Sequence, residues 1–199
     1  AMAWPSPIRR GVSMTELTIT AMGRRGEGIA RDDGRTSFVP GTLPGETVIA
    51  EGEGERLTLL TVERPSPDRI APFCPHYGRC GGCQLQHWRE EPYRAWKASL
   101  VRDALAAQGI ACEVPDCIDA HGEGRRRVIL HVRKRGGVVT AGYMAPRSHD
   151  LLDIDRCPIL APALDGAFDI ARALGERLGD CDVAVTATLT GLDVSVKAE

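Results

Sequence analysis

Three closely spaced cysteines near the middle of the chain constrain its fold more than any other feature. They form the pattern C-x5-C-x2-C at Cys74, Cys80 and Cys83. The last two flank a pair of glycines, which let a backbone wrap tightly around an inorganic centre. The chain has 7 cysteines, an odd number that fits a fully paired disulfide framework poorly. The pattern therefore predicts a metal-binding loop.

Three thiolates on one loop require a fourth ligand from elsewhere in the chain. The remaining cysteines are Cys112, Cys117, Cys157 and Cys181. Cys157 is the preferred candidate because it precedes Pro158 outside any expected helix or strand, and a Cys-Pro pair also ends ferredoxin-type cluster loops. A tetrahedral zinc ion and an iron–sulfur cluster both take four thiolates, so the spacing leaves the two open.

The segment before the cysteine loop predicts a small β-barrel. Residues 14–72 alternate apolar and polar side chains and are punctuated by Gly and Pro, as short strands joined by turns are. Strands are expected at residues 17–21, 38–39, 47–50 and 57–62. Residues 1–13 have no such periodicity and precede Met14, so we treat them as an extension or a tag.

The segment after the loop predicts an α+β domain. Apolar residues at helical spacing indicate helices at 91–108 and 163–178. Alternating residues indicate a hairpin at 125–143 that turns at Gly136 and Gly137, and a second hairpin at 183–189 and 192–196. The expected organisation is thus a barrel at 14–72, a cysteine loop at 73–90 and a central α+β domain at 91–199. We expect this last domain to be truncated, because the chain ends at its final strand.

Charge adds a second candidate site. The chain has 25 Lys and Arg against 27 Asp and Glu, which excludes a globally basic nucleic-acid binder but not a basic face. Residues 121–149 carry seven basic residues against Glu123 alone: Arg125, Arg126, Arg127, Arg133, Lys134, Arg135 and Arg147. Such a hairpin predicts an RNA-tracking surface, with a merely solvated face as the alternative. No apolar run suits a membrane helix or a secretion signal, so we expect a cytoplasmic protein without a membrane partner.

The cysteine pattern also carries a family resemblance. The segment CPHYGRCGGCQLQHW at 74–88 resembles the 4Fe-4S signature of the RNA (uracil-5-)-methyltransferase family, whose fourth ligand lies roughly seventy residues downstream. Here 73 residues separate Cys83 from Cys157, within RSHDLLDIDRCPIL at 147–160, which resembles the family's segment around that ligand. GEGIAR at 26–31 and VPGTLPGETV at 39–48 resemble a TRAM domain, an RNA-binding barrel of OB type. The resemblance covers about residues 15–199.

The resemblance implies a structural 4Fe-4S cluster on Cys74, Cys80, Cys83 and Cys157, and RNA as the partner, ribosomal rather than transfer RNA. It implies S-adenosylmethionine as the methyl donor of the full-length member, bound by a C-terminal methyltransferase domain that is missing here. The chain has no strand and Gly-rich turn of the Rossmann type, so we assign it no catalytic residue and expect it to be inactive alone. The alternatives are a stand-alone RNA-binding module with a structural four-cysteine metal site and an electron-transfer protein.

Overall fold

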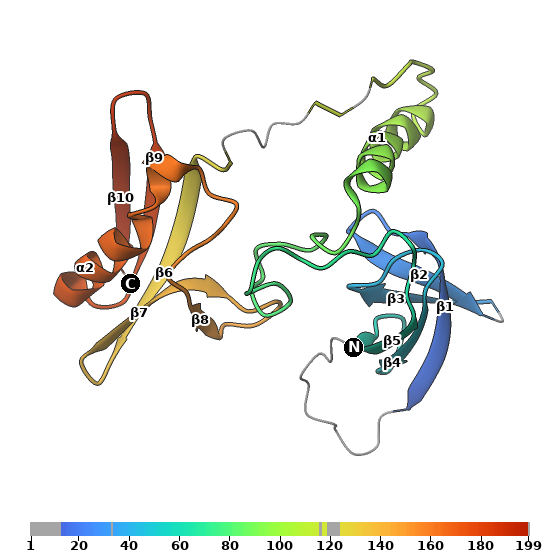
Figure 1. Cartoon of the computed structure of the whole chain (residues 1–199), viewed down its shortest axis with the longest axis horizontal. Coiled ribbons are helices and arrows are strands. Elements are labelled where there is room, and N and C mark those ends of the chain that lie inside the picture. Colours follow the sequence, from blue (N-terminus) through green and yellow to red (C-terminus); the bar gives the residue numbers. More distant parts are fainter. Residues whose placement is uncertain (1–12, 33, 116, 119–123, 199) are drawn as a thin grey trace. The chain divides into compact units, whose positions relative to one another are not determined.

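The computed structural model describes residues 13–32, 34–115, 117–118 and 124–198. The chain divides into two compact units, and each is described by itself (Figure 1). The first contains Ala1–Pro72 and Gln84–Cys117, and the second contains Phe73–Cys83 and Ile118–Glu199. In the part of the chain that the structure describes, no helix is both long and apolar enough to span a membrane.

The first unit is built on an antiparallel sheet with the strand order β3-β2-β1-β4-β5. Its strands are β1 (Met14–Met22), β2 (Glu27–Asp32), β3 (Arg35–Pro40), β4 (Thr47–Glu51) and β5 (Thr58–Arg64). Phe38 of β3 also exchanges backbone hydrogen bonds with Glu55 and Leu57, just before β5, so that the two sides of the sheet meet. The predicted β-barrel is therefore confirmed.

Alternation of buried and exposed residues explains why most of these strands could be predicted. Leu17 and Ile19 of β1, and Val48 and Ala50 of β4, point into the core, whereas their neighbours are exposed or half-buried. Strand β2 was not predicted, because the glycines at its start indicate a turn. A Cβ on Gly28 would lie 2.0 Å from Thr42 Oγ1, so the strand needs glycine there to pack closely.

A completely buried carboxylate fastens the turn before β4 to the segment after β5. Glu46 accepts hydrogen bonds from the backbone N–H of Leu43 at 2.8 Å and of Ser66 at 3.2 Å. Arg69 donates to both carboxylate oxygens, with Nη2 at 2.8 Å from Oε2, and to the carbonyl oxygen of Gly41 at 2.7 Å. This arrangement satisfies the charge of Glu46 by pairing it with a fork of donors.

His87 lies beside this ion pair and is only 1% exposed. Burial lowers the pKa of His87 to about 4, and the charge of Arg69 lowers it further, while Glu46 and a backbone hydrogen bond with Thr42 oppose the shift. The imidazole is therefore neutral at pH 7. The sequence placed His87 next to the cysteine loop, and in the structure it belongs to the first unit.

This shift predicts that acid destabilises the first unit. The unfolded chain binds a proton on His87 near pH 6.5, whereas the folded chain does so only near pH 4. The stability is therefore full above pH 6.5 and falls between pH 6.5 and 4, by at most about 1.4 kcal/mol per pH unit. We expect urea unfolding at pH 7 and pH 5 to show this loss, and His87→Gln to have a shallower pH slope. An equal slope in both proteins would exclude His87 as the cause, and exposed His149→Gln serves as the control.

The predicted first helix is confirmed as α1 (Glu90–Ala106). Its start is anchored by Trp88, Tyr93 and Trp96, whose ring centroids lie 5.6 to 6.3 Å apart, with Lys97 over two of the rings. These rings pack on one another, as expected for anchoring residues. The predicted domain limit at residue 91 stays a prediction; by its contacts α1 groups with the first unit.

The second unit contains a second antiparallel sheet with the order β10-β9-β6-β7-β8. Its elements are β6 (Arg127–Arg135), β7 (Val138–Met144), β8 (Leu151–Asp153), the 3-10 turn η1 (Pro162–Leu164), α2 (Ala167–Leu178), β9 (Cys181–Ala187) and β10 (Leu192–Ala198). Both predicted hairpins are thereby confirmed. The second helix begins later than predicted, because Pro162–Leu164 forms the separate turn.

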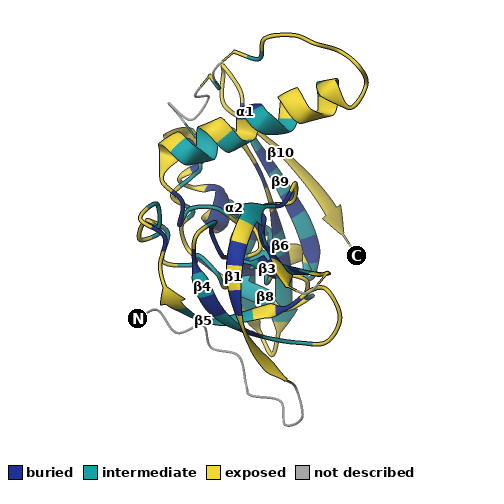
Figure 2. Ribbon diagram, turned by 90° about the vertical axis from the view of Figure 1, so that its right-hand side faces the viewer, coloured by how far each residue is buried: buried dark blue, intermediate teal, exposed yellow. Residues whose placement is uncertain are grey.

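Helix α2 packs on one face of this sheet. Val128, Leu130 and Val132 of β6 form a core with Phe168 and Ala171 of α2. Gly175 lets the helix approach β6, since a Cβ there would lie 2.4 Å from a methyl group of Val132. In the same sheet, β9 carries buried residues along its length, whereas β10 is exposed throughout (Figure 2). The combination of barrel and α+β sheet agrees with the predicted fold class.

Candidate metal centre and nucleic-acid interface

The cysteine loop belongs to the second unit, together with Cys157. Tight turns shape the loop: the N–H of Tyr77 donates to the carbonyl oxygen of Cys74 at 3.1 Å, and the N–H of Cys80 donates to that of His76 at 2.8 Å. Gly78 between them has φ 84°, a conformation that favours glycine. The loop therefore folds back on itself and carries Cys74 and Cys80 toward each other.

Gly81 ties this loop to the end of β7. Its N–H donates to the carbonyl oxygen of Met144 at 3.0 Å, and a Cβ on Gly81 would lie 2.9 Å from that oxygen. The neighbouring Gly82 donates its N–H to Cys80 Sγ at 3.3 Å. Glycine is thus required at position 81 by the close approach to Met144, and Gly82 donates a hydrogen bond to a thiol.

Cys157 lies after β8 and packs, with Tyr143 of β7, against the core of the second unit. Burial raises the pKa of Cys80; a hydrogen bond from the Gly82 backbone lowers it, Cys157 and Cys74 raise it, and the charge of Arg125 lowers it. Burial also raises the pKa of Tyr143, followed by the charge of Cys157 and a hydrogen bond with it. Cys74 and Cys157 therefore both lie close enough to Cys80 for their charges to affect it.

The chemistry of this donor set fits a thiolate-bound metal centre. The four cysteines of the predicted ligand set are half-buried, and none of them forms a disulfide. Burial, the largest cause, raises the pKa of Cys80 overall, whereas the backbone donor at its sulfur and the positive charge of Arg125 oppose that shift and favour the thiolate that ligation requires. Among the described residues, no three His, Cys, Asp or Glu side chains converge as a single bound ion requires. The ligand set of Cys74, Cys80, Cys83 and Cys157 stays a prediction.

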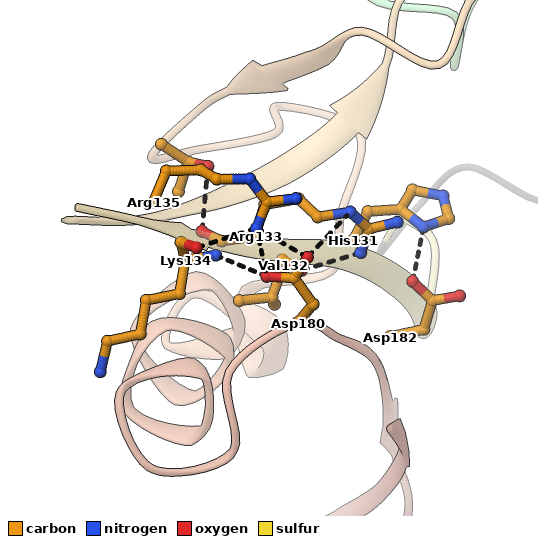
Figure 3. Close-up of polar contacts among 8 residues, drawn as sticks. His131, Val132, Arg133, Lys134, Arg135, Asp180 and Asp182 are labelled. Atoms are coloured by element: carbon orange, nitrogen blue, oxygen red, sulfur yellow. Dashed lines mark hydrogen bonds and ion pairs between the residues drawn. The ribbon is translucent and has the colours of Figure 1, made fainter. Parts of the chain in front are cut away.

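The second candidate site, the basic hairpin, has acidic partners that its own sequence does not reveal. Arg135 Nη1 donates to both carboxylate oxygens of Asp180 at 2.8 Å, and the backbone N–H of Lys134 donates to the same carboxylate at 2.8 Å (Figure 3). Arg133 Nε lies 3.9 Å from Asp180. Lys134 Nζ reaches Glu176 of α2 at 2.9 Å.

These contacts hold the pKa of Asp180 below its usual range. The backbone hydrogen bond from Lys134 is the main cause, followed by the hydrogen bond from Arg135, and the charges of Arg135 and Arg133 add to both. Three of the seven predicted RNA-binding residues are thus partly neutralised within the protein. The sequence could not show this, because Asp180 lies 45 residues after Arg135.

The other four predicted RNA-binding residues have different surroundings. Arg126 and Arg127 are exposed at the start of β6. Arg125 is held by backbone hydrogen bonds with Ile159 and Ala161, after Cys157, and its charge acts on Cys80. Arg147 occupies a tight turn with φ 56°. The predicted set is therefore split between a paired group and an exposed group.

Comparison with known proteins finds a family model and several relatives that match this chain. A family model described as "TRAM domain" matches residues 12–51. An uncharacterized RNA methyltransferase of Caulobacter vibrioides is 44% identical over 191 residues, which are 92% of this chain and 46% of that protein. A similar protein of Brucella suis is 38% identical over 184 residues, 90% of this chain and 44% of its own length. A 23S rRNA (uracil(1939)-C(5))-methyltransferase of Halomonas elongata is 45% identical over 175 residues, 82% of this chain and 36% of its own length.

The chain thus carries a TRAM domain and is related over most of its length to RNA methyltransferases. It spans about half the length of the first two of these relatives. The predicted TRAM domain and the predicted resemblance to RNA methyltransferases are thus confirmed.

Proposed function

We propose that this chain is the RNA-binding and 4Fe-4S-binding portion of an S-adenosylmethionine-dependent RNA uracil-C5 methyltransferase, acting on 23S rRNA in the cytoplasm. The observation that carries the proposal is the 45% identity to a protein named for that reaction, over a stretch of 175 residues. TRAM domains bind RNA in the family that this chain resembles. The TRAM domain matched at residues 12–51 therefore supports RNA binding by the barrel.

A four-iron cluster on the cysteine set is part of the proposal. The group would be held by Cys74, Cys80 and Cys83 from the loop and by Cys157 from the segment after β8. Its support is the donor set itself: four half-buried thiols outside any disulfide in one unit, with the Gly82 N–H at a thiol sulfur. When bound, such a centre supplies cross-linking between distant segments, and we assign it no electron transfer.

The chain's own residues then bind and orient RNA rather than perform the chemistry. The barrel and the exposed arginines of the second unit contact the phosphate backbone. Methyl transfer needs a domain that binds S-adenosylmethionine, which the family resemblance implies in the full-length protein. We expect the 199-residue chain to bind a 23S rRNA fragment and to transfer no methyl group to it. Incubation with that RNA and labelled S-adenosylmethionine tests this, and a methylated product would contradict the proposed division of labour.

Arg126 and Arg127 provide the sharpest test of RNA binding. Replacing both by glutamine should weaken binding to the rRNA fragment about tenfold and reduce the salt dependence by one or two phosphate contacts, each about 0.7 to 0.9 in slope. A filter or fluorescence binding series over salt concentration measures both quantities. Arg102→Gln on the exposed side of α1 is the matched control, since it removes an exposed positive charge from the other unit. An equal loss in the control would mean that only total charge matters.

A further inference from the structure

Tyr143 lies near both segments that supply the predicted cluster ligands. It is the residue of β7 before Met144, whose carbonyl oxygen accepts the hydrogen bond from Gly81 of the cysteine loop. Together with Cys157 it packs against the core of the second unit. Its hydroxyl forms a hydrogen bond with the Cys157 side chain, and Cys80 is close enough for its charge to act on the same hydroxyl. A single tyrosine therefore contacts the distant ligand and lies beside the loop.

The fold fixes the position of this hydroxyl without help from the thiol. The backbone of Tyr143 pairs with Leu152 in the β7–β8 ladder. Its ring packs edge-on against Phe168 of α2, with the ring centroids 6.3 Å apart and the ring planes at 86°. Because both contacts involve only the backbone and the ring, a phenylalanine at this position would keep them and lose the hydroxyl alone.

The segment that carries Cys157 is also fixed by the protein itself. On its N-terminal side, Arg172 Nη2 of α2 donates to Asp153 Oδ1 at 3.0 Å and to the carbonyl oxygen of Ile154 at 3.1 Å. On its C-terminal side, the N–H of Leu160 donates to the carbonyl oxygen of Cys157 at 3.1 Å. These contacts hold the backbone on both sides of the cysteine, so its sulfur stays beside the hydroxyl of β7.

A hydrogen bond to a ligand sulfur affects how easily an iron–sulfur cluster is reduced. A thiolate bound to iron keeps further lone pairs, and a tyrosine hydroxyl is protonated at neutral pH, so the hydroxyl can donate to the bound sulfur. Reduction adds one negative charge to the cluster and its ligands. A donor at the sulfur stabilises the more negative form more strongly, and the reduction potential rises as a result.

We propose that the Tyr143 hydroxyl donates a hydrogen bond to the Cys157 sulfur when the cluster is bound, and thereby raises the reduction potential of the cluster. This inference rests on the 4Fe-4S cluster of the proposed function. The Gly82 N–H, 3.3 Å from Cys80 Sγ, gives a second ligand sulfur a donor, but that donor belongs to the backbone. The hydroxyl of Tyr143 is therefore the donor that a substitution removes most cleanly.

A redox titration of Tyr143→Phe tests the proposal. The chain is purified without oxygen, reduced stepwise with added dithionite, and followed by its absorption near 400 nm and by electron paramagnetic resonance. The equilibrium constant for reduction should fall about tenfold, which is about 59 mV for one electron, while the iron and sulfide contents stay those of the wild type. Tyr93→Phe is the matched control, because it removes a tyrosine hydroxyl from the first unit, and it should leave the potential unchanged.

A fluorinated tyrosine covers the case in which Tyr143→Phe loses the cluster. Fluorine next to the hydroxyl makes the phenol more acidic and a stronger donor, so incorporation at Tyr143 should raise the potential instead of lowering it. With four irons and four sulfides in the wild type, a potential that is unchanged in Tyr143→Phe, or that does not rise in the fluorinated chain, would overturn this inference and leave the cluster standing. One zinc without sulfide in the wild type would overturn the cluster and this inference together.

Discussion

Replacing Glu46 by glutamine should lower the free energy of unfolding of the first unit by about 3 to 5 kcal/mol. The carboxylate is completely buried and accepts hydrogen bonds from two backbone N–H groups and from Arg69. A glutamine keeps one acceptor oxygen but turns an N–H₂ donor toward these donors. It also leaves the Arg69 guanidinium without its counter-charge in a largely buried site.

Tryptophan fluorescence during urea unfolding measures this effect, since Trp88 and Trp96 both belong to the first unit. Glu53→Gln is the matched control, because Glu53 is exposed and the substitution is chemically the same. The control should change the unfolding free energy by less than about 0.5 kcal/mol. A similarly small change for Glu46→Gln would mean that the ion pair contributes no more than an exposed one.

The barrel could be predicted because buried and exposed positions alternate along its strands, and the sequence shows this alternation. Strands β1 and β4 alternate apolar and polar residues, and each was placed within a few residues. The start of strand β2 shows no such alternation, because Gly28 packs closely against Thr42 there and has no apolar side chain to contribute. Strand β8 has only three residues, too few for a period to be recognised.

The role of Glu46 could not be predicted for a different reason. Its partners Ser66 and Arg69 lie 20 and 23 residues further along the chain, and a glutamate in a turn has no local sign of burial. The acidic partners of the basic hairpin could not be predicted either, for the same reason. Local charge counting recognised Arg135 but not Asp180, which the fold brings to it from the end of α2.

The cysteine loop is the part of the candidate site that the sequence marks most clearly, although its ligand set stays a prediction. The spacing of Cys74, Cys80 and Cys83 is a local property of the sequence, and glycine at 81 follows from the close approach of the loop to Met144. The environment of the loop was not predictable. Tyr143 and Arg125 come from different parts of the second unit, and nothing in their own segments marks them as neighbours of the thiols.

Cys157→Ser should release most of the metal and lower the melting temperature by about 6 to 12 °C. Cys157 comes from the segment after β8 and the other three predicted ligands come from residues 74–83, so only Cys157 links the loop to that segment through the centre. Three thiolates hold a cluster poorly, and the free energy of ligation is also free energy of folding. A loss of about 3 kcal/mol corresponds to roughly this shift for a chain of this size.

Iron, zinc and acid-labile sulfide analysis of chain purified without oxygen, combined with a thermal melt, measures both effects. The wild type should contain about four irons and four sulfides, with broad absorption near 400 nm. Cys112→Ser is the matched control, because Cys112 is exposed and lies outside the predicted ligand set. One zinc without sulfide in the wild type would replace the cluster by a structural four-cysteine zinc site and favour a stand-alone RNA-binding module. Unchanged metal content and melting in Cys157→Ser would remove Cys157 from the ligand set.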